Sequence, residues 1–126
     1  MTETYAYIAC FVFACLVIFQ LALILGAPIG KFAWGGYHEV LPKKLRIASL
    51  ISVFSYLAFS VTILESAGLV SLFSSDRMVS IVMWLVTTYF FIGVIMNGIS
   101  RSKYERTVMT PVVLALAVLF LLVAWS

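Results

Sequence analysis

Charged and hydrogen-bonding side chains gather in two short polar segments between long apolar runs. His38 and Glu39 place an imidazole beside a carboxylate, a pair that could act as a general base or a ligand. In the second segment, Arg101 and a nearby amide suit an anionic head group or a phosphate. We therefore predict a candidate ligand or partner surface made of Trp34, His38, Glu39, Asn97, Arg101, Glu105 and Arg106. Helix capping, loop-fixing hydrogen bonds and lipid anchoring explain the same residues, so both interpretations stay open.

The sequence gives no reason to predict catalytic residues, a metal site or a bound cofactor. The glycine-lysine segment 26–31 is one residue short of a phosphate-binding loop, and Phe32 stands where that loop needs Ser or Thr. One histidine without Cys or further His partners makes a poor metal set. Cys10 and Cys15 would be about 140° apart on a helix, which disfavours an internal disulfide.

A second group of polar side chains lies inside the apolar runs. In the second run, hydroxyl-bearing residues recur at offsets of 3, 4 and 4, which places them within an arc of about 80° on a helix. With one amide from the first run, they form a candidate intramembrane polar stripe: Gln20, Ser49, Ser52, Tyr56 and Ser60. Such stripes usually serve helix packing, and the alternative is a polar path through a bundle. The fourth run carries no polar side chain over 112–124, so we expect its helix to be the most exposed to lipid.

These residues must be positioned by helices that cross a bilayer. Hydrophobic residues make up 64% of the chain and charged residues 10%, against about 45–50% and about 25% in soluble domains. Four uncharged runs have the length that spans the hydrocarbon core, where backbone amides must bond within their own segment. The runs are Tyr5–Leu25, Ile47–Leu64, Met78–Met96 and Thr107–Trp125. We predict a single domain over 1–126, an all-α membrane protein with a four-transmembrane-helix bundle, its helices at about 5–25, 47–65, 77–98 and 104–125.

Local signals mark where these helices begin and end. Gly26 ends the first helix, and Pro42 suits the first turn of the second. Ser74, Ser75 and Asp76 are candidate caps for the third. Ser102 and Glu105 have the spacing of a capping box, so we expect the fourth helix to start near Ser102 and to contain Pro111, rather than to start at Pro111.

The distribution of positive charge predicts the orientation. Seven of the eight Lys and Arg residues fall in the 26–46 and 97–106 connections, and only Arg77 falls in the 65–77 connection. The positive-inside rule places the first two in the cytoplasm, as cytoplasmic loops 26–46 and 99–103, and both termini on the non-cytoplasmic side. The net charge of +3 thus faces lipid head groups, with no basic helix of the kind that tracks nucleic acid. The N-terminal segment has no basic start and should remain as an anchor.

The first of these connections is rich in glycine and aromatic residues. Gly35-Gly36 between Trp34 and Tyr37 fits a two-residue hairpin turn that would pair the two aromatic side chains. We expect an ordered loop that lies on the membrane surface, because an isolated hairpin is only marginally stable in water.

Two stretches carry a resemblance to a known group. These are Gly26-Ala-Pro28-x-Gly30-x-x-x-Trp34-Gly35-Gly36, followed by Leu41-Pro42-x-x-Leu45-Arg46, and Asn97-x-x-Ser100-Arg101-Ser102-x-x-Glu105-Arg106 with Pro111. They resemble the two cytoplasmic turns of a group of small bacterial four-helix membrane proteins to which no reaction is assigned. The resemblance implies a multi-pass protein of the bacterial plasma membrane, and it transfers no catalytic residue.

Three functions remain open from the sequence. The first is a non-enzymatic binding or accessory module that uses its cytoplasmic loops, with the lipid bilayer and its anionic head groups as partner. The second is a subunit of a small oligomeric transporter or channel, and small-residue faces would allow copies of the chain to associate. The third is a membrane enzyme that acts on an anionic lipid.

Overall fold

A computed structural model of the protein describes residues 1–73 and 75–126. Within these residues it contains four α-helices of 23 or 24 residues, each long and apolar enough to cross a membrane, and two short 3₁₀ turns. In chain order the elements are α1 (Thr2–Ile24), η1 (Gly30–Phe32), η2 (Trp34–Gly36), α2 (Lys43–Ser66), α3 (Asp76–Gly98) and α4 (Lys103–Trp125). The predicted all-helical, four-helix fold is therefore confirmed.

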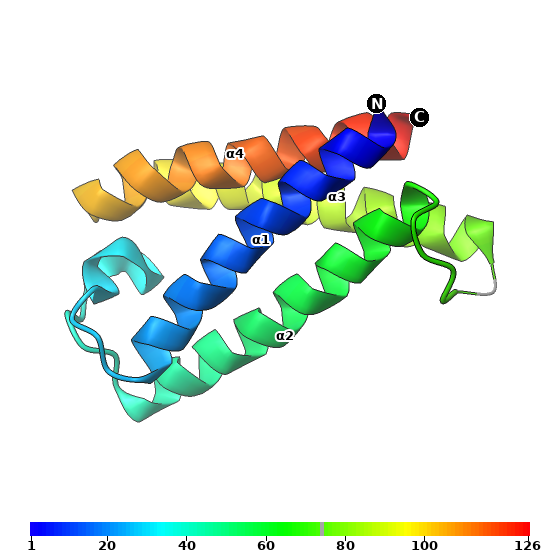
Figure 1. The fold of residues 1–126 in the computed structure, drawn as a ribbon. Coiled ribbons are helices and arrows are strands. Elements are labelled where there is room, and N and C mark those ends of the chain that lie inside the picture. The colour runs from blue at the N-terminus through cyan, green and yellow to red at the C-terminus, as the bar shows by residue number, and fades with distance from the viewer. Residues whose placement is uncertain (74) are drawn as a thin grey trace.

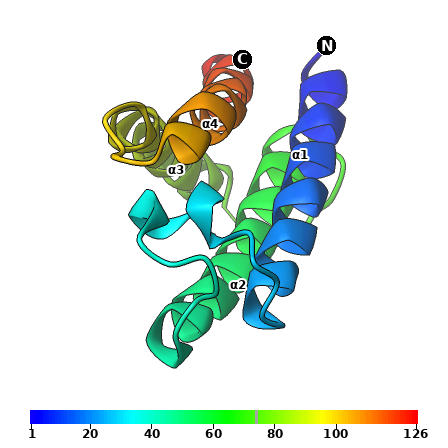
Figure 2. The same ribbon diagram turned by 90° about the vertical axis from the view of Figure 1, so that its left-hand side faces the viewer.

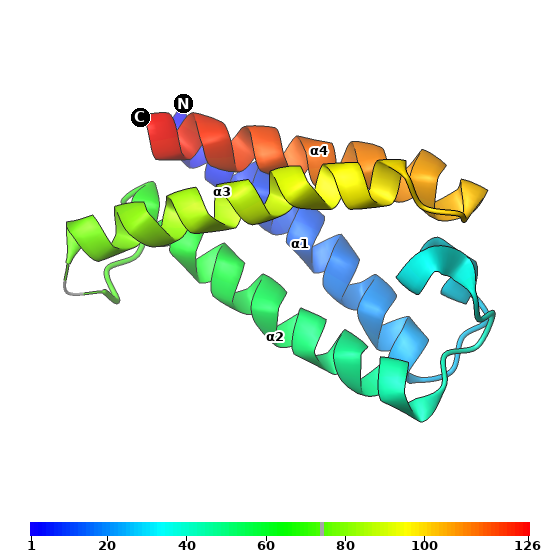
Figure 3. The same cartoon turned by 180° about the vertical axis from the view of Figure 1, so that it is seen from behind.

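The helices form two hairpins, α1–α2 and α3–α4, which meet at one end and spread apart at the other (Figure 1). Both termini and the connection between α2 and α3 lie at the end where the hairpins meet, which we call the closed end. The connection between α1 and α2 folds into the space at the opposite end, which we call the open end. Figure 3 shows the same divergence from behind.

The hydrophobic core lies toward the closed end. Phe13 of α1 packs against Phe90 of α3 and Phe120 of α4, with ring centroids 5.9 Å away in both cases. Ala6 and Ala9 are fully buried, and their small side chains allow α1 to approach its neighbours closely. Aromatic rings and small residues thus hold the two hairpins together on this side.

The ends of α1 and α2 follow the local sequence signals. Gly26 adopts a φ of +96°, and the next amide, of Ala27, donates to the Ala22 carbonyl at 3.0 Å. This is a helix-ending motif that favours glycine, because residues with a Cβ rarely adopt positive φ. Pro42 takes the N-cap position of α2. The chain therefore leaves α1 and enters α2 at points that the sequence marks.

The two later helices are capped by serine. Ser75 Oγ accepts a hydrogen bond from the Met78 amide at 3.3 Å. Of the other two predicted caps, Asp76 is the first residue of α3, and Ser74 lies outside the described residues. Ser102 Oγ accepts from the Glu105 amide at 3.3 Å, and Pro111 lies inside α4. The early start of the fourth helix is confirmed.

The expected exposure of the fourth helix is wrong. Helix α4 packs along α3 and also contacts α1 and α2. It buries Leu116, Ala117 and Phe120 completely, whereas α2 has the smallest buried share of the four helices. An apolar helix without polar side chains is equally suited to lipid and to a bundle core, so composition did not distinguish the two.

The predicted hairpin in the first connection is also wrong. Gly35 and Gly36 have φ values of +76° and +73°, but they belong to a 3₁₀ turn rather than to a turn between paired strands. The Gly36 amide donates to the Ala33 carbonyl at 2.9 Å. The indole of Trp34 donates to Ser49 in α2 instead of facing Tyr37 across a ladder. Contacts with the helices therefore outweigh local strand pairing.

Candidate functional site

A cleft of about 740 Å³ lies between the two hairpins toward the open end. Residues from all four helices and from the α1–α2 connection line it, and we call it the inter-hairpin cleft. Figure 2 faces the open end and shows the connection lying between the α1–α2 hairpin and the ends of α3 and α4. On the side of α3, Ile92 and Met96 line the cleft and are more than half exposed, so it is open there.

The body of the cleft is apolar. Leu16 and Phe19 line it from α1, and Met109 and Val113 line it from α4. Phe90 lies at the junction with the core, where its ring is 5.4 Å from that of Phe120. The apolar lining is therefore continuous with the aromatic core, which fills the space between the hairpins beyond it.

Polar side chains also lie within this apolar body, and Gln20 is more buried than Ser52 and Tyr56. Gln20 is only 7% exposed, and its Oε1 atom is buried without a hydrogen-bond partner. Tyr56 and Ser52 of α2 line the same part of the cleft, and Tyr56 neighbours Gln20. A buried acceptor that lacks a donor costs about 1–3 kcal/mol. Among the described residues only Thr110 Oγ1 is similarly buried and unpartnered, and it does not line the cleft.

A carboxylate lies where the connection meets α4. Glu105 is 8% exposed, and its Oε2 atom accepts a hydrogen bond from the Gly35 amide at 3.4 Å. This bond replaces the second half of the predicted capping box, because the side chain turns to the connection rather than to the amide of its own N-cap residue. Within residues 1–73 and 75–126, Gly35 is the one donor to this carboxylate.

A guanidinium completes the polar end of the cleft. Arg101 lies with its guanidinium carbon 4.1 Å from the centroid of the Tyr37 ring, an arrangement that positions the cation over the aromatic face. Its Nη2 atom donates a long hydrogen bond of 3.4 Å to the Gly36 carbonyl. Arginine has five N–H donors, so Arg101 keeps donors for a further partner.

The connection is fixed to the helices on both sides. Trp34 Nε1 donates to Ser49 Oγ of α2 at 3.1 Å, and Ser102 Oγ donates to the Lys31 carbonyl. Lys31 Nζ lies 4.3 Å from the centroid of the Tyr104 ring in α4. These contacts come from both hairpins, so the connection bridges the open end.

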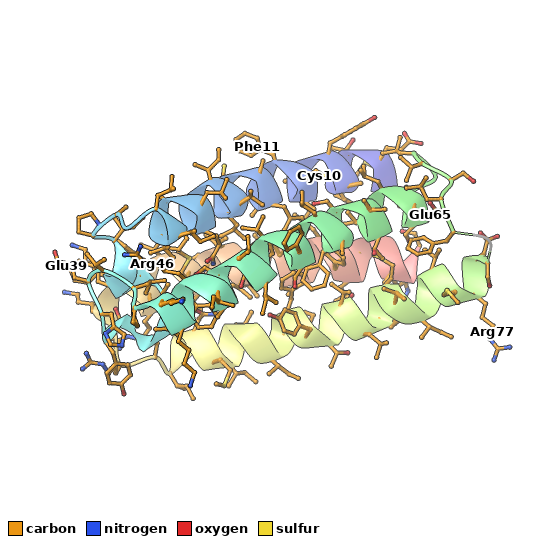
Figure 4. All side chains as sticks on the ribbon, turned by 90° about the horizontal axis from the view of Figure 1, so that it is seen from below. Cys10, Phe11, Glu39, Arg46, Glu65 and Arg77 are labelled. Atoms are coloured by element: carbon orange, nitrogen blue, oxygen red, sulfur yellow. The ribbon has the colours of Figure 1, made fainter. Side chains whose placement is uncertain are left out.

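A basic side chain at the start of α2 joins the two ends of the connection. Arg46 Nε donates to the Leu41 carbonyl at 2.8 Å, and its Nη1 donates to the Ile24 carbonyl at the end of α1 at 3.4 Å. A cation at a helix C-terminus is favourable because the last carbonyls carry partial negative charge. Figure 4 shows Arg46 and Glu39 at the end opposite Glu65 and Arg77.

The structure brings the two sets of residues predicted from the sequence into one cleft. Seven of the twelve line it: Trp34, Asn97, Arg101 and Glu105 from the predicted surface, and Gln20, Ser52 and Tyr56 from the predicted stripe. Five do not line it: His38, Glu39, Arg106, Ser49 and Ser60. His38 and Glu39 are exposed, and Ser60 bonds to the Tyr56 carbonyl of its own helix.

Sequence reasoning missed several residues of the cleft. Phe19, Tyr89, Phe90 and Met109 line it, and apolar residues within long apolar runs gave no signal of this. Tyr37 could have been found, because it adjoins two glycines and lies near the basic segments. Its role as a platform for Arg101 depends on a contact across 64 residues of sequence, which no local pattern reveals.

A smaller hollow of about 170 Å³ lies near the closed end and is lined by Glu65, Asp76 and Ser80 among others. Glu65 accepts from the amides of Leu72 at 2.6 Å and Phe73 at 3.3 Å, so it fixes the α2–α3 connection. Among the described residues, no group of three His, Cys, Asp or Glu side chains is placed to hold a metal ion.

Comparison with protein-family models, with curated proteins and with solved structures found no match to this chain. The function must therefore be argued from the geometry of the cleft.

Proposed function

We propose that this chain is a multi-pass protein of the bacterial plasma membrane that binds one amphipathic, lipid-like ligand in the inter-hairpin cleft. Both termini lie outside the cell in this arrangement, and the open end lies at the cytoplasmic face. The four long apolar helices support membrane insertion. The positions of Lys and Arg support the orientation, because seven of the eight lie at or near the open end.

The main support for this proposal is the change from polar to apolar side chains along the cleft. Its outer end has a carboxylate and a guanidinium, and its body has aliphatic and aromatic side chains. A molecule with a polar head and a hydrocarbon tail matches both parts. The volume of about 740 Å³ is within the range of about 300–1,000 Å³ that small-molecule sites occupy. The opening beside Ile92 and Met96 would allow the ligand to enter from the bilayer.

The same geometry gives less support to transport or catalysis. A transport path would need polar groups through the whole bundle, but Phe13, Phe90 and Phe120 fill the space beyond the cleft. A catalytic role for His38 or Glu39 would need them beside a bound substrate, and both lie outside the lining. Ligand binding is the function that best fits the positions of the residues that line the cleft.

To test this proposal, a substitution at Ser52 places an aromatic ring in the cleft. Ser52 lines the cleft, and Ser55 lies one turn further along α2 outside the lining. Each donates to the carbonyl four residues earlier, Ala48 for Ser52 and Ile51 for Ser55, so the two lose equivalent hydrogen bonds. We expect Ser52→Phe to reduce lipid retained in native mass spectrometry from mild detergent by at least about tenfold, because the ring occupies the ligand volume. Ser55→Phe should retain lipid as the wild type does. Equal retention by both variants, or none by the wild type, would refute the proposal.

A further inference from the structure

Glu105 and Arg101 place opposite charges at the polar end of the cleft without pairing with each other. No ion pair between them appears among the described residues, and each has only a long hydrogen bond of 3.4 Å to the backbone of the connection. A buried carboxylate without a cationic partner is unfavourable in a low-dielectric site. The arrangement therefore leaves one acceptor and one set of donors for a ligand.

The charge pattern selects a class of head group. A purely anionic head would satisfy Arg101 and be repelled by Glu105, and a purely cationic head would do the reverse. A head with an ammonium and a phosphate satisfies both, through charge-assisted hydrogen bonds of the ammonium to Glu105 and of the phosphate to Arg101. Lipid anchoring by Arg101 alone, as the sequence suggested, does not use the carboxylate.

We infer that the ligand is a zwitterionic phospholipid, with its ammonium at Glu105 and its phosphate at Arg101. Its hydrocarbon part lies among Leu16, Met109 and Val113. This inference rests on the proposed function and specifies its ligand.

The experiment titrates the intact protein in a non-ionic detergent and measures bound lipid by native mass spectrometry. The probes are lysophosphatidylethanolamine and lysophosphatidylglycerol, which share the phosphate and differ in the ammonium. We expect the first to bind about tenfold more tightly than the second, since the second lacks the group matched to Glu105.

Two variants test the contact at Glu105. Glu105→Gln keeps an acceptor for the Gly35 amide but removes the charge, and it should abolish the preference for the ammonium head over the glycerol head. Glu39→Gln makes the same change at an exposed site outside the cleft and should preserve that preference. Thermal unfolding of each variant identifies any loss that comes from misfolding.

The outcomes separate this inference from the proposed function. If the wild type binds both lipids equally, or if Glu105→Gln keeps the head-group preference while remaining folded, the inference is wrong and lipid binding in the cleft stands. If the wild type binds none of the probes and Ser52→Phe changes nothing, both are wrong.

Discussion

The indole nitrogen of Trp34 donates a hydrogen bond of 3.1 Å to the hydroxyl of Ser49, and this bond joins the α1–α2 connection to a fully buried residue of α2. Trp34 itself has a φ of +52°, an unusual conformation for a bulky residue. The backbone strain at Trp34 is compatible with the fold because the side chain is fixed at its far end. The outer wall of the cleft therefore depends on a contact between a strained loop residue and a helix.

We first predict that Trp34→Phe destabilises the protein through loss of this bond. The bond is worth about 0.5–1.5 kcal/mol, and a buried Ser49 hydroxyl would be left without it. A double-mutant cycle with Ser49→Ala, measured by unfolding in mixed micelles, should give a coupling free energy in that range. Strictly additive effects of the two substitutions would show that the contact does not form.

Next, we predict that the aromatic core depends on Phe13 far more than on its neighbour. Phe13 is 1% exposed and packs against Phe90 and Phe120, whereas Phe11 is 70% exposed on the outer face of α1. Phe13→Ala should lower the free energy of unfolding by at least about 2 kcal/mol, because it leaves a cavity between the hairpins. Phe11→Ala removes the same ring from the surface and should cost much less. Equal free energies of unfolding for the two variants would contradict this prediction.

A third prediction concerns the close approach of the connection to the start of α4. A Cβ at Gly36 would lie 2.5 Å from Ser102 Cβ, whereas a Cβ at Gly68 would meet no atom within 4 Å. Both glycines have positive φ, of +73° and +81°, so Gly36→Ala and Gly68→Ala share the same backbone strain. We expect Gly36→Ala to be the less stable by about 1 kcal/mol or more and to weaken lipid binding, because the connection must move away from Ser102. Equal melting temperatures and equal binding would contradict this.

Finally, the orientation of the chain in the membrane can be determined by labelling engineered cysteines from outside intact cells. In a background with Cys10→Ala and Cys15→Ala, Thr2→Cys should react with a membrane-impermeant maleimide, and Lys44→Cys should react only after permeabilisation. The physical reason is the retention of Lys and Arg on the cytoplasmic side. The reverse pattern would overturn the proposed topology and would place the mouth of the cleft on the outer face.

Several features of this protein follow from the sequence alone. The four helices follow from uncharged runs of 18 to 21 residues, because such segments satisfy their own backbone amides. The start of α4 follows from the spacing of Ser102 and Glu105, and the end of α1 follows from Gly26. These are local effects, in which each residue acts on amides or dihedral angles within a few positions of itself.

The tertiary structure alone decided the rest. The α1–α2 connection is not a hairpin, since contacts with Ser49 and Ser102 determine its path. The same packing places Gln20 of one hairpin and Arg101 and Glu105 of the other around a single cleft. No periodicity within a helix encodes the angle at which two hairpins diverge, because that angle depends on which side chains fill the space between them. Where Phe13 meets Phe90 and Phe120 the hairpins close, and where Gln20 faces the open end they leave room for a ligand.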